Sequence, residues 1–135
     1  MSNNISGLTA AVFAGMLAVL AGCSVIGENK SRIVSISPDI NTVLSAGDKL
    51  DVEVTVEYRL KQDVGSMSLV IQDAQNTPVA SLVEPLKKGA GRLTLKRTIT
   101  VPKTSAISVD TPLYSDGETS TYITDRKVFK VIAKK

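Results

Sequence analysis

The feature that most constrains the fold of this chain is a strict alternation of apolar and polar residues from Lys49 to Leu60. One side of the alternation consists of Leu50, Val52, Val54, Val56, Tyr58 and Leu60. The other side consists of Asp51, Glu53, Thr55, Glu57 and Arg59. Successive side chains of a β-strand point to opposite faces of its sheet, so this pattern predicts a strand with one buried face. In a helix the same apolar residues would be spread around the whole cylinder, which disfavours a helix.

Weaker strand signals occur in six further segments. These are Arg32–Ser37, Ser66–Asp73, Pro78–Val83, Arg92–Val101, Ala106–Leu113 and Thr121–Ile132. Turn-forming residues separate them at 45–48, 63–65, 75–78, 88–91 and 115–117. The pattern predicts an all-β fold, a single antiparallel β-sandwich of about seven strands over residues 32–135.

The number and spacing of these strands resemble bacterial immunoglobulin-like and fibronectin type III-like domains. The resemblance is architectural, because the Cys and Trp residues typical of antibody domains are absent from the predicted domain. Two positions stand out. Arg97 is the one charged residue at an apolar position of its predicted strand, and Tyr122 is expected either to fix a corner or, more simply, to pack half-buried.

The segment Leu8–Ala21 is apolar and rich in Ala, Leu and Val, and its 14 residues fall short of the roughly 20 needed to span a bilayer as a helix. Its layout is typical of a helical secretory signal peptide. It ends in Leu20-Ala21-Gly22-Cys23, which closely resembles the lipobox of bacterial lipoproteins. An uncleaved apolar anchor or a buried helix is the alternative, since residues 1–7 lack the usual Lys or Arg.

The resemblance implies that residues 1–22 are a lipoprotein signal peptide, with Leu20, Ala21 and Gly22 recognised by the signal peptidase. It further implies that Cys23 carries a thioether-linked lipid, that acyl chains such as palmitate hold the protein on a membrane, and that Ser24 directs it to the outer membrane of a Gram-negative host. Residues 23–31 are then the lipidated cysteine and a short tether.

Catalytic chemistry has little support in the composition. The chain has no His and a single Cys, which removes the common nucleophile–base arrangements and the His or Cys metal sites. We therefore expect no enzyme activity, no cofactor, no metal and no small-molecule substrate. The net charge of +3, with acids and bases interspersed and few aromatics, also disfavours nucleic-acid binding.

Basic residues gather near the carboxyl end. They are Arg126, Lys127, Lys130, Lys134 and Lys135. This run is a candidate contact for an anionic surface. The simpler interpretation is the solvated face and end of an edge strand that lysines protect from aggregation.

Taken together, these features predict a lipid-anchored, non-catalytic protein of the cell envelope, on the periplasmic or surface side of the outer membrane if the host is Gram-negative. It would act by protein binding, as an accessory or structural part of an envelope assembly whose protein partner is unidentified. The alternative is a surface-recognition lipoprotein, adhesin-like or exclusion-type, that binds a glycan or a protein of another cell.

Overall fold

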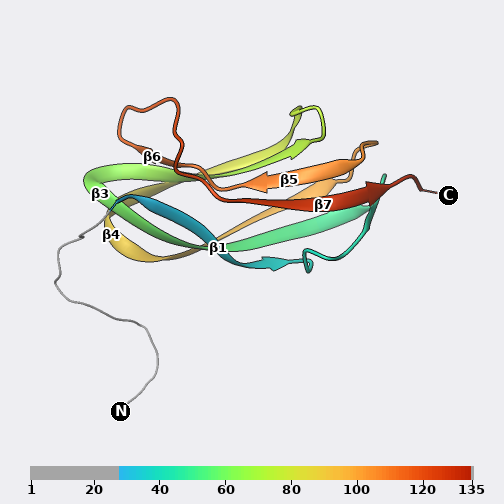
Figure 1. The fold of residues 1–135 in the computed structure, drawn as a ribbon, viewed down its shortest axis with the longest axis horizontal. Helices are drawn as coiled ribbons and strands as arrows, with labels where there is room; N and C mark the ends of the chain where they lie inside the picture. The colour runs from blue at the N-terminus through green and yellow to red at the C-terminus, as the bar shows by residue number, and fades with distance from the viewer. Residues whose placement is uncertain (1–27, 135) are drawn as a thin grey trace, which may run out of the picture.

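The computed structural model describes residues 28–134. Within this range the protein is all-β, as expected, and Figure 1 shows an elongated arrangement of strands. The strands are β1 (Lys30–Ser37), β2 (Leu44–Ser45), β3 (Lys49–Asp73), β4 (Pro78–Thr100), β5 (Ala106–Asp110), β6 (Leu113–Ser115) and β7 (Arg126–Ile132). In the same range no helix is long and apolar enough to cross a membrane. The predicted signal peptide, Cys23 and Ser24 lie outside the described residues.

Two long strands, β3 and β4, form one hairpin and account for four of the predicted strands. They are 25 and 23 residues long and pair antiparallel from Lys49↔Thr100 to Gln72↔Pro78. The turns predicted at residues 63–65 and 88–91 are therefore wrong, because both segments lie inside strands. The pairing shifts register between Leu60 and Val64, and such an irregularity bends a strand without ending it.

Glycines at this bend allow close backbone contacts. A Cβ at Gly65 would overlap the carbonyl oxygen of Tyr114, and Gly89 has a φ of +135°, which L side chains rarely adopt. These glycines had indicated turns in the sequence. In the fold they let β3 and β4 pass the bend and let β6 approach β3 closely.

The alternating pattern of Lys49–Leu60 does produce one buried face. Val52, Val54, Val56 and Leu60 are fully buried, and the intervening polar residues are exposed or half-buried. Arg97, the exception to the apolar pattern of its own segment, is exposed, and its Nε donates a hydrogen bond to the carbonyl oxygen of Ser81 at 3.0 Å. This contact joins the two halves of β4 across the edge of the sheet.

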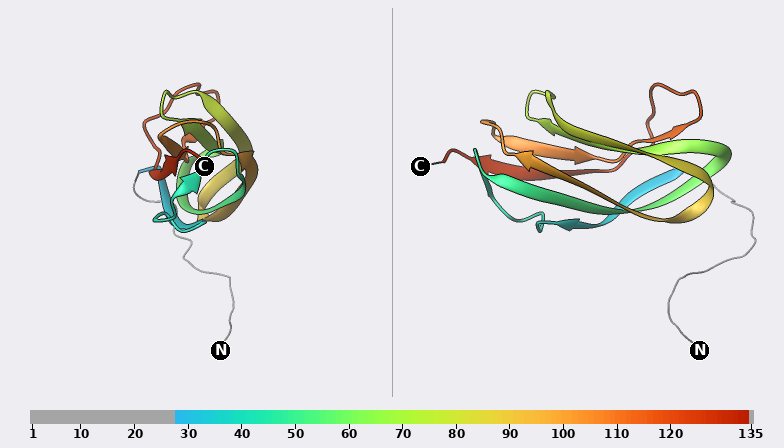
Figure 2. Two further views of the ribbon diagram at one scale, coloured as in Figure 1. Left: turned by 90° about the vertical axis from the view of Figure 1, so that its right-hand side faces the viewer. Right: turned by 180° about the vertical axis from the view of Figure 1, so that it is seen from behind.

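The seven strands belong to one curled sheet with the order β1-β3-β5-β7-β2, and β4 and β6 also pair with β3. In Figure 2 the strands lie around a common interior. One core fills it, and its largest fully buried side chain is Phe129 of β7. The sheet is mixed and does not fit the expectation of a purely antiparallel one, since β2 pairs parallel with β7 through Leu44↔Val131 and Ser45↔Ile132.

The last predicted strands are shorter than expected. The segment Ala106–Leu113 is divided between β5 and β6, because Pro112 has no N–H to donate to a ladder. The segment Thr121–Ile132 forms a strand only from Arg126 onward. Tyr122 lies before it and is fully exposed, so both roles expected for it, corner-fixing and half-buried packing, are wrong.

Candidate functional site

The chain joins the sheet at Asn29. The Oδ1 atom of Asn29 accepts a hydrogen bond from the backbone N–H of Lys61 at 2.8 Å. Two residues later, Ser31 Oγ donates to the carbonyl oxygen of Thr111 at 2.6 Å. The final residues of the segment predicted as a tether, residues 23–31, are therefore attached to the fold, and β1 begins within that segment.

An ion network lies next to this point and links three strands. The carboxylate of Glu57 on β3 contacts Lys30 and Arg32 of β1 at 2.9 and 2.8 Å, and Arg92 of β4 at 3.8 Å. Arg32, Glu57 and Arg92 lie directly opposite one another in the strand register. Hydrogen bonds from Arg32 and then Lys30 lower the pKa of the Glu57 carboxyl from 4.5 to about 2. One carboxylate thus contacts three cations, and two of their positive charges are not compensated within the network.

Four more basic residues surround the network at the bend of β3 and β4. Arg59 lies opposite Lys30 in the register, and its Nη1 donates to the carbonyl oxygen of Glu28 at 3.4 Å. Lys61, Lys87 and Lys88 are exposed. None of these four forms an ion pair within 4.0 Å with any residue in the described range. We call the whole group the tether-end basic face. Its members are Lys30, Arg32, Arg59, Lys61, Lys87, Lys88 and Arg92.

The basic residues predicted near the carboxyl end do not form one patch of free cations. Arg126 makes two hydrogen bonds to Asp110, which is 8% exposed, at 2.6 and 3.2 Å. These bonds raise the pKa of the Arg126 guanidinium above its ordinary value. Lys134 pairs with Asp48 at 2.6 Å.

The remaining residues of that predicted run differ in their surroundings. Lys130 is exposed and Lys127 is half-buried on β7, and neither has an ion-pair partner within the described range. Lys135 lies outside the described residues. The end of β7 lies at the opposite end of the long axis from the point where the described residues begin (Figure 1).

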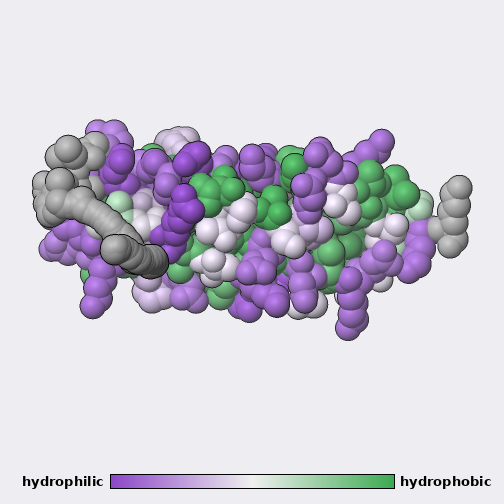
Figure 3. Space-filling model, turned by 90° about the horizontal axis from the view of Figure 1, so that it is seen from below, coloured by the Kyte–Doolittle hydropathy of each residue, from purple (hydrophilic) through white to green (hydrophobic). Residues whose placement is uncertain are grey.

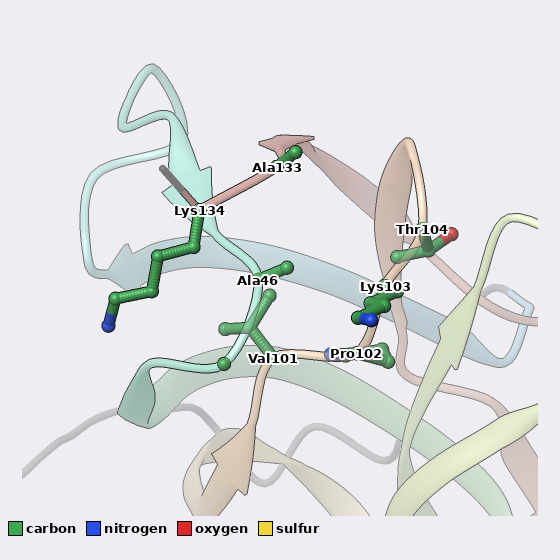
Figure 4. A pocket seen from close by; sticks show the side chains of 8 residues that line it. Ala46, Val101, Pro102, Lys103, Thr104, Ala133 and Lys134 are labelled. Atoms are coloured by element: carbon green, nitrogen blue, oxygen red, sulfur yellow. The ribbon is translucent and has the colours of Figure 1, made fainter.

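A depression of about 610 Å³ lies at this end of the molecule (Figure 4). It is lined by Ala46, Gly47, Val101, Pro102, Lys103, Thr104, Ala133 and Lys134. The amine of Lys134 is already paired with Asp48. The described residues that line the depression include no carboxylate, and the hydroxyl of Thr104 is hydrogen-bonded to the backbone of Ala74 and Ala106.

Two polar side chains that join distant parts of the chain by hydrogen bonds were not identified from the sequence. One is Asn29, which was assigned to the tether. The other is Asp125, whose Oδ2 accepts from the N–H of Ile33 at 2.8 Å, at the irregularity in β1. Each bond joins residues far apart in the chain, so no local pattern could have indicated it. The ion network of Glu57 was likewise hidden, since its partners are set by the register of three strands.

Comparisons with known proteins do not assign a family. No family model matches the sequence, and no curated protein matches it. Two crystal structures of β-glucosidase from Listeria innocua are similar to this chain. The first is 18% identical, with a TM-score of 0.46 over 79% of this chain and 16% of that chain. The second, in complex with glucose, is 19% identical, with a TM-score of 0.44 over 77% of this chain and 16% of that chain. This chain therefore spans less than a fifth of the β-glucosidase.

Proposed function

We propose that this protein is a lipid-anchored, non-catalytic component of a bacterial cell envelope. The observation that carries the proposal is Leu20-Ala21-Gly22-Cys23, which has the residue types of a lipobox and stands six residues before Asn29. An all-β domain begins directly after that short interval, with its first strand starting at Lys30. A lipid on Cys23 would therefore keep the domain at the membrane surface.

We further propose that the curled sheet works as an immunoglobulin-like β-sandwich. In this view β1, residues 49–60 and residues 90–100 form one layer. Residues 64–87 of the long hairpin, together with the remaining strands, form the other. The register shift between Leu60 and Val64 of β3, opposite residues 87–89 of β4, supports this division. A bend at this point lets both strands take part in both layers.

Binding to a protein partner is the activity that we propose for the domain. β4 pairs with β3 alone among the described strands, so its 23 residues present a second edge of backbone donors and acceptors. Such edges accept strands of other proteins. A lipid anchor would raise the effective concentration of this edge near envelope proteins.

Surface recognition is the second candidate, and one observation favours it. Tyr122, in the connection between β6 and β7, is fully exposed. Tyrosine is typical of recognition loops because it offers a large, rigid contact area. Crosslinking in cells separates the two candidates, since recovery of envelope proteins supports the first. Binding of the purified protein to intact cells, with no envelope protein recovered, supports the second.

The anchor is tested by Cys23→Ala. We expect the variant to lose labelling by radioactive palmitate and to accumulate as a species 22 residues longer than the mature wild type. Ser24→Ala is the matched control, and it should still be labelled and cut. A Cys23→Ala protein that is processed to the wild-type size and stays on the membrane would show that the proposal is wrong.

A further inference from the structure

The charges of this molecule are unevenly distributed along its length. The tether-end basic face has seven cations, and the segments that carry them, residues 28–32, 57–63 and 87–92, contain three acidic residues, Glu28, Glu57 and Asp63. This region therefore has an excess of four positive charges. The other described residues include eight Lys or Arg and ten Asp or Glu, an excess of two negative charges. One end of the molecule is therefore positively charged, although the net charge of the chain is small.

This basic face surrounds the point where the described chain begins. Arg59 donates to the carbonyl oxygen of Glu28, Lys61 N–H donates to Asn29, and Lys30 is the first residue of β1. Lysines 87 and 88 lie on β4 beside the bend. Two further acids, Asp116 and Glu118, follow β6, which pairs with β3 on the side opposite β4.

The segment before Glu28 is too short to hold this face far from a lipid on Cys23. Four residues lie between the two positions, and the five backbone steps from Cys23 to Glu28 span at most about 18 Å when fully extended. The potential of an anionic membrane falls off over about 8 to 10 Å at physiological salt. Cationic side chains placed within that reach would be attracted to the headgroups, and each one whose charge is not compensated by an acid adds about a five-fold preference for the surface.

The surface of the molecule also favours a polar contact. Figure 3, seen from below Figure 1, shows hydrophilic side chains along the whole length, with smaller apolar areas between them. Arg32 and Arg92 have side chains that are 59% and 64% exposed. Cations of this kind can reach phosphate oxygens without a change in the fold.

We propose that the tether-end basic face rests on anionic lipid headgroups of the membrane that holds the protein. The proposal rests on the proposed lipid anchor, and it adds the orientation of the anchored protein relative to the bilayer. The positive end lies against the bilayer, while the depression and the carboxyl end point away from it. The outer edge of β4 beyond the bend is then left free for a protein partner.

Lysine footprinting of the purified, lipidated full chain tests this orientation. The protein is reconstituted into vesicles of phosphatidylcholine alone, or of three parts phosphatidylcholine to one part phosphatidylglycerol, and is labelled with acetic anhydride. In the anionic vesicles we expect labelling of Lys61, Lys87 and Lys88 to fall at least about three-fold. We expect that of Lys103 and Lys130 to stay constant. Salt at about 0.5 M should restore the labelling.

A pair of charge-matched variants provides the control. Lys87→Glu with Lys88→Glu should abolish the protection of Lys61, whereas Lys103→Glu with Lys130→Glu should leave it intact. Equal labelling at both ends of the anchored protein would overturn the orientation while leaving the anchor in place. Protection of Lys61, Lys87 and Lys88 that is seen in cells but not in anionic vesicles would also overturn the orientation, in favour of an acidic protein partner. Failure of the anchor is seen separately, as protein that does not float with the vesicles.

Discussion

Removal of the Glu57 carboxylate by Glu57→Gln tests whether the ion network contributes to stability. The carboxylate joins β1, β3 and β4 through Lys30, Arg32 and Arg92, and its side chain is only 28% exposed. The substitution keeps the shape of the side chain and removes its charge. It leaves three cations close together with no anion between them, so we expect the folded state to lose free energy relative to the unfolded state.

The size of the loss follows from the pKa of Glu57. The fall from 4.5 to about 2 on folding corresponds to at most about 3 kcal/mol at neutral pH. Water screens the pairs, because Arg32 and Arg92 are more than half exposed, and we therefore expect about 1 to 2 kcal/mol. The folded pKa lies below the unfolded value, so this contribution is complete above pH 4.5 and is lost as the pH falls toward 2.

Urea unfolding followed by far-ultraviolet circular dichroism measures this difference. The free energies of unfolding of wild type and Glu57→Gln should differ by about 1 to 2 kcal/mol near pH 7. About a quarter of the difference should remain near pH 2.5. Glu53→Gln is the matched control, since Glu53 is exposed on the same face of β3 and forms no ion pair in the described range. Equal effects of the two variants near pH 7, or a difference independent of pH, would refute the reasoning.

Two further substitutions test other parts of the structure. Arg126→Met should destabilise the protein by about 2 kcal/mol in urea unfolding, because it leaves the largely buried Asp110 carboxylate without its partner. Lys130→Met on the same strand should change stability by less than about 0.5 kcal/mol, and similar losses for both would contradict a structural role for Arg126. Gly65→Ala should cost more than about 2 kcal/mol, because its Cβ would overlap the backbone of Tyr114 and force β6 to move. A thermal midpoint unchanged from wild type would show that β6 does not approach β3 this closely.

Much of the fold could be predicted from alternation alone. The buried face of Lys49–Leu60 and the apolar positions of Arg92–Val101, apart from Arg97, are buried or half-buried as the pattern indicates. The continuity of β3 and β4 could not be predicted, because Asp63–Gly65 and Gly89 look like turns when read locally. They lie inside strands because each strand has a partner across the bend that continues the hydrogen-bonded ladder.

The charged surfaces also could not be predicted from local sequence patterns. The run from Arg126 to Lys135 resembles a single basic patch because its cations are neighbours in the sequence, yet Asp110 and Asp48 pair with two of them. The tether-end basic face cannot be recognised from the sequence, because its members come from three separate segments, residues 30–32, 59–61 and 87–92. Only the register of β1, β3 and β4 brings those segments together.

The sequence by itself determined the secondary structure type and which side of each long strand is buried. Both depend on a period of two along the backbone, which is a local property of an extended chain. The tertiary structure decided where the strands bend, which strand pairs parallel, and which cations keep a free charge. Those outcomes depend on contacts between residues far apart in the chain, whose pairing is selected by packing of the common core and by the ladder of backbone hydrogen bonds.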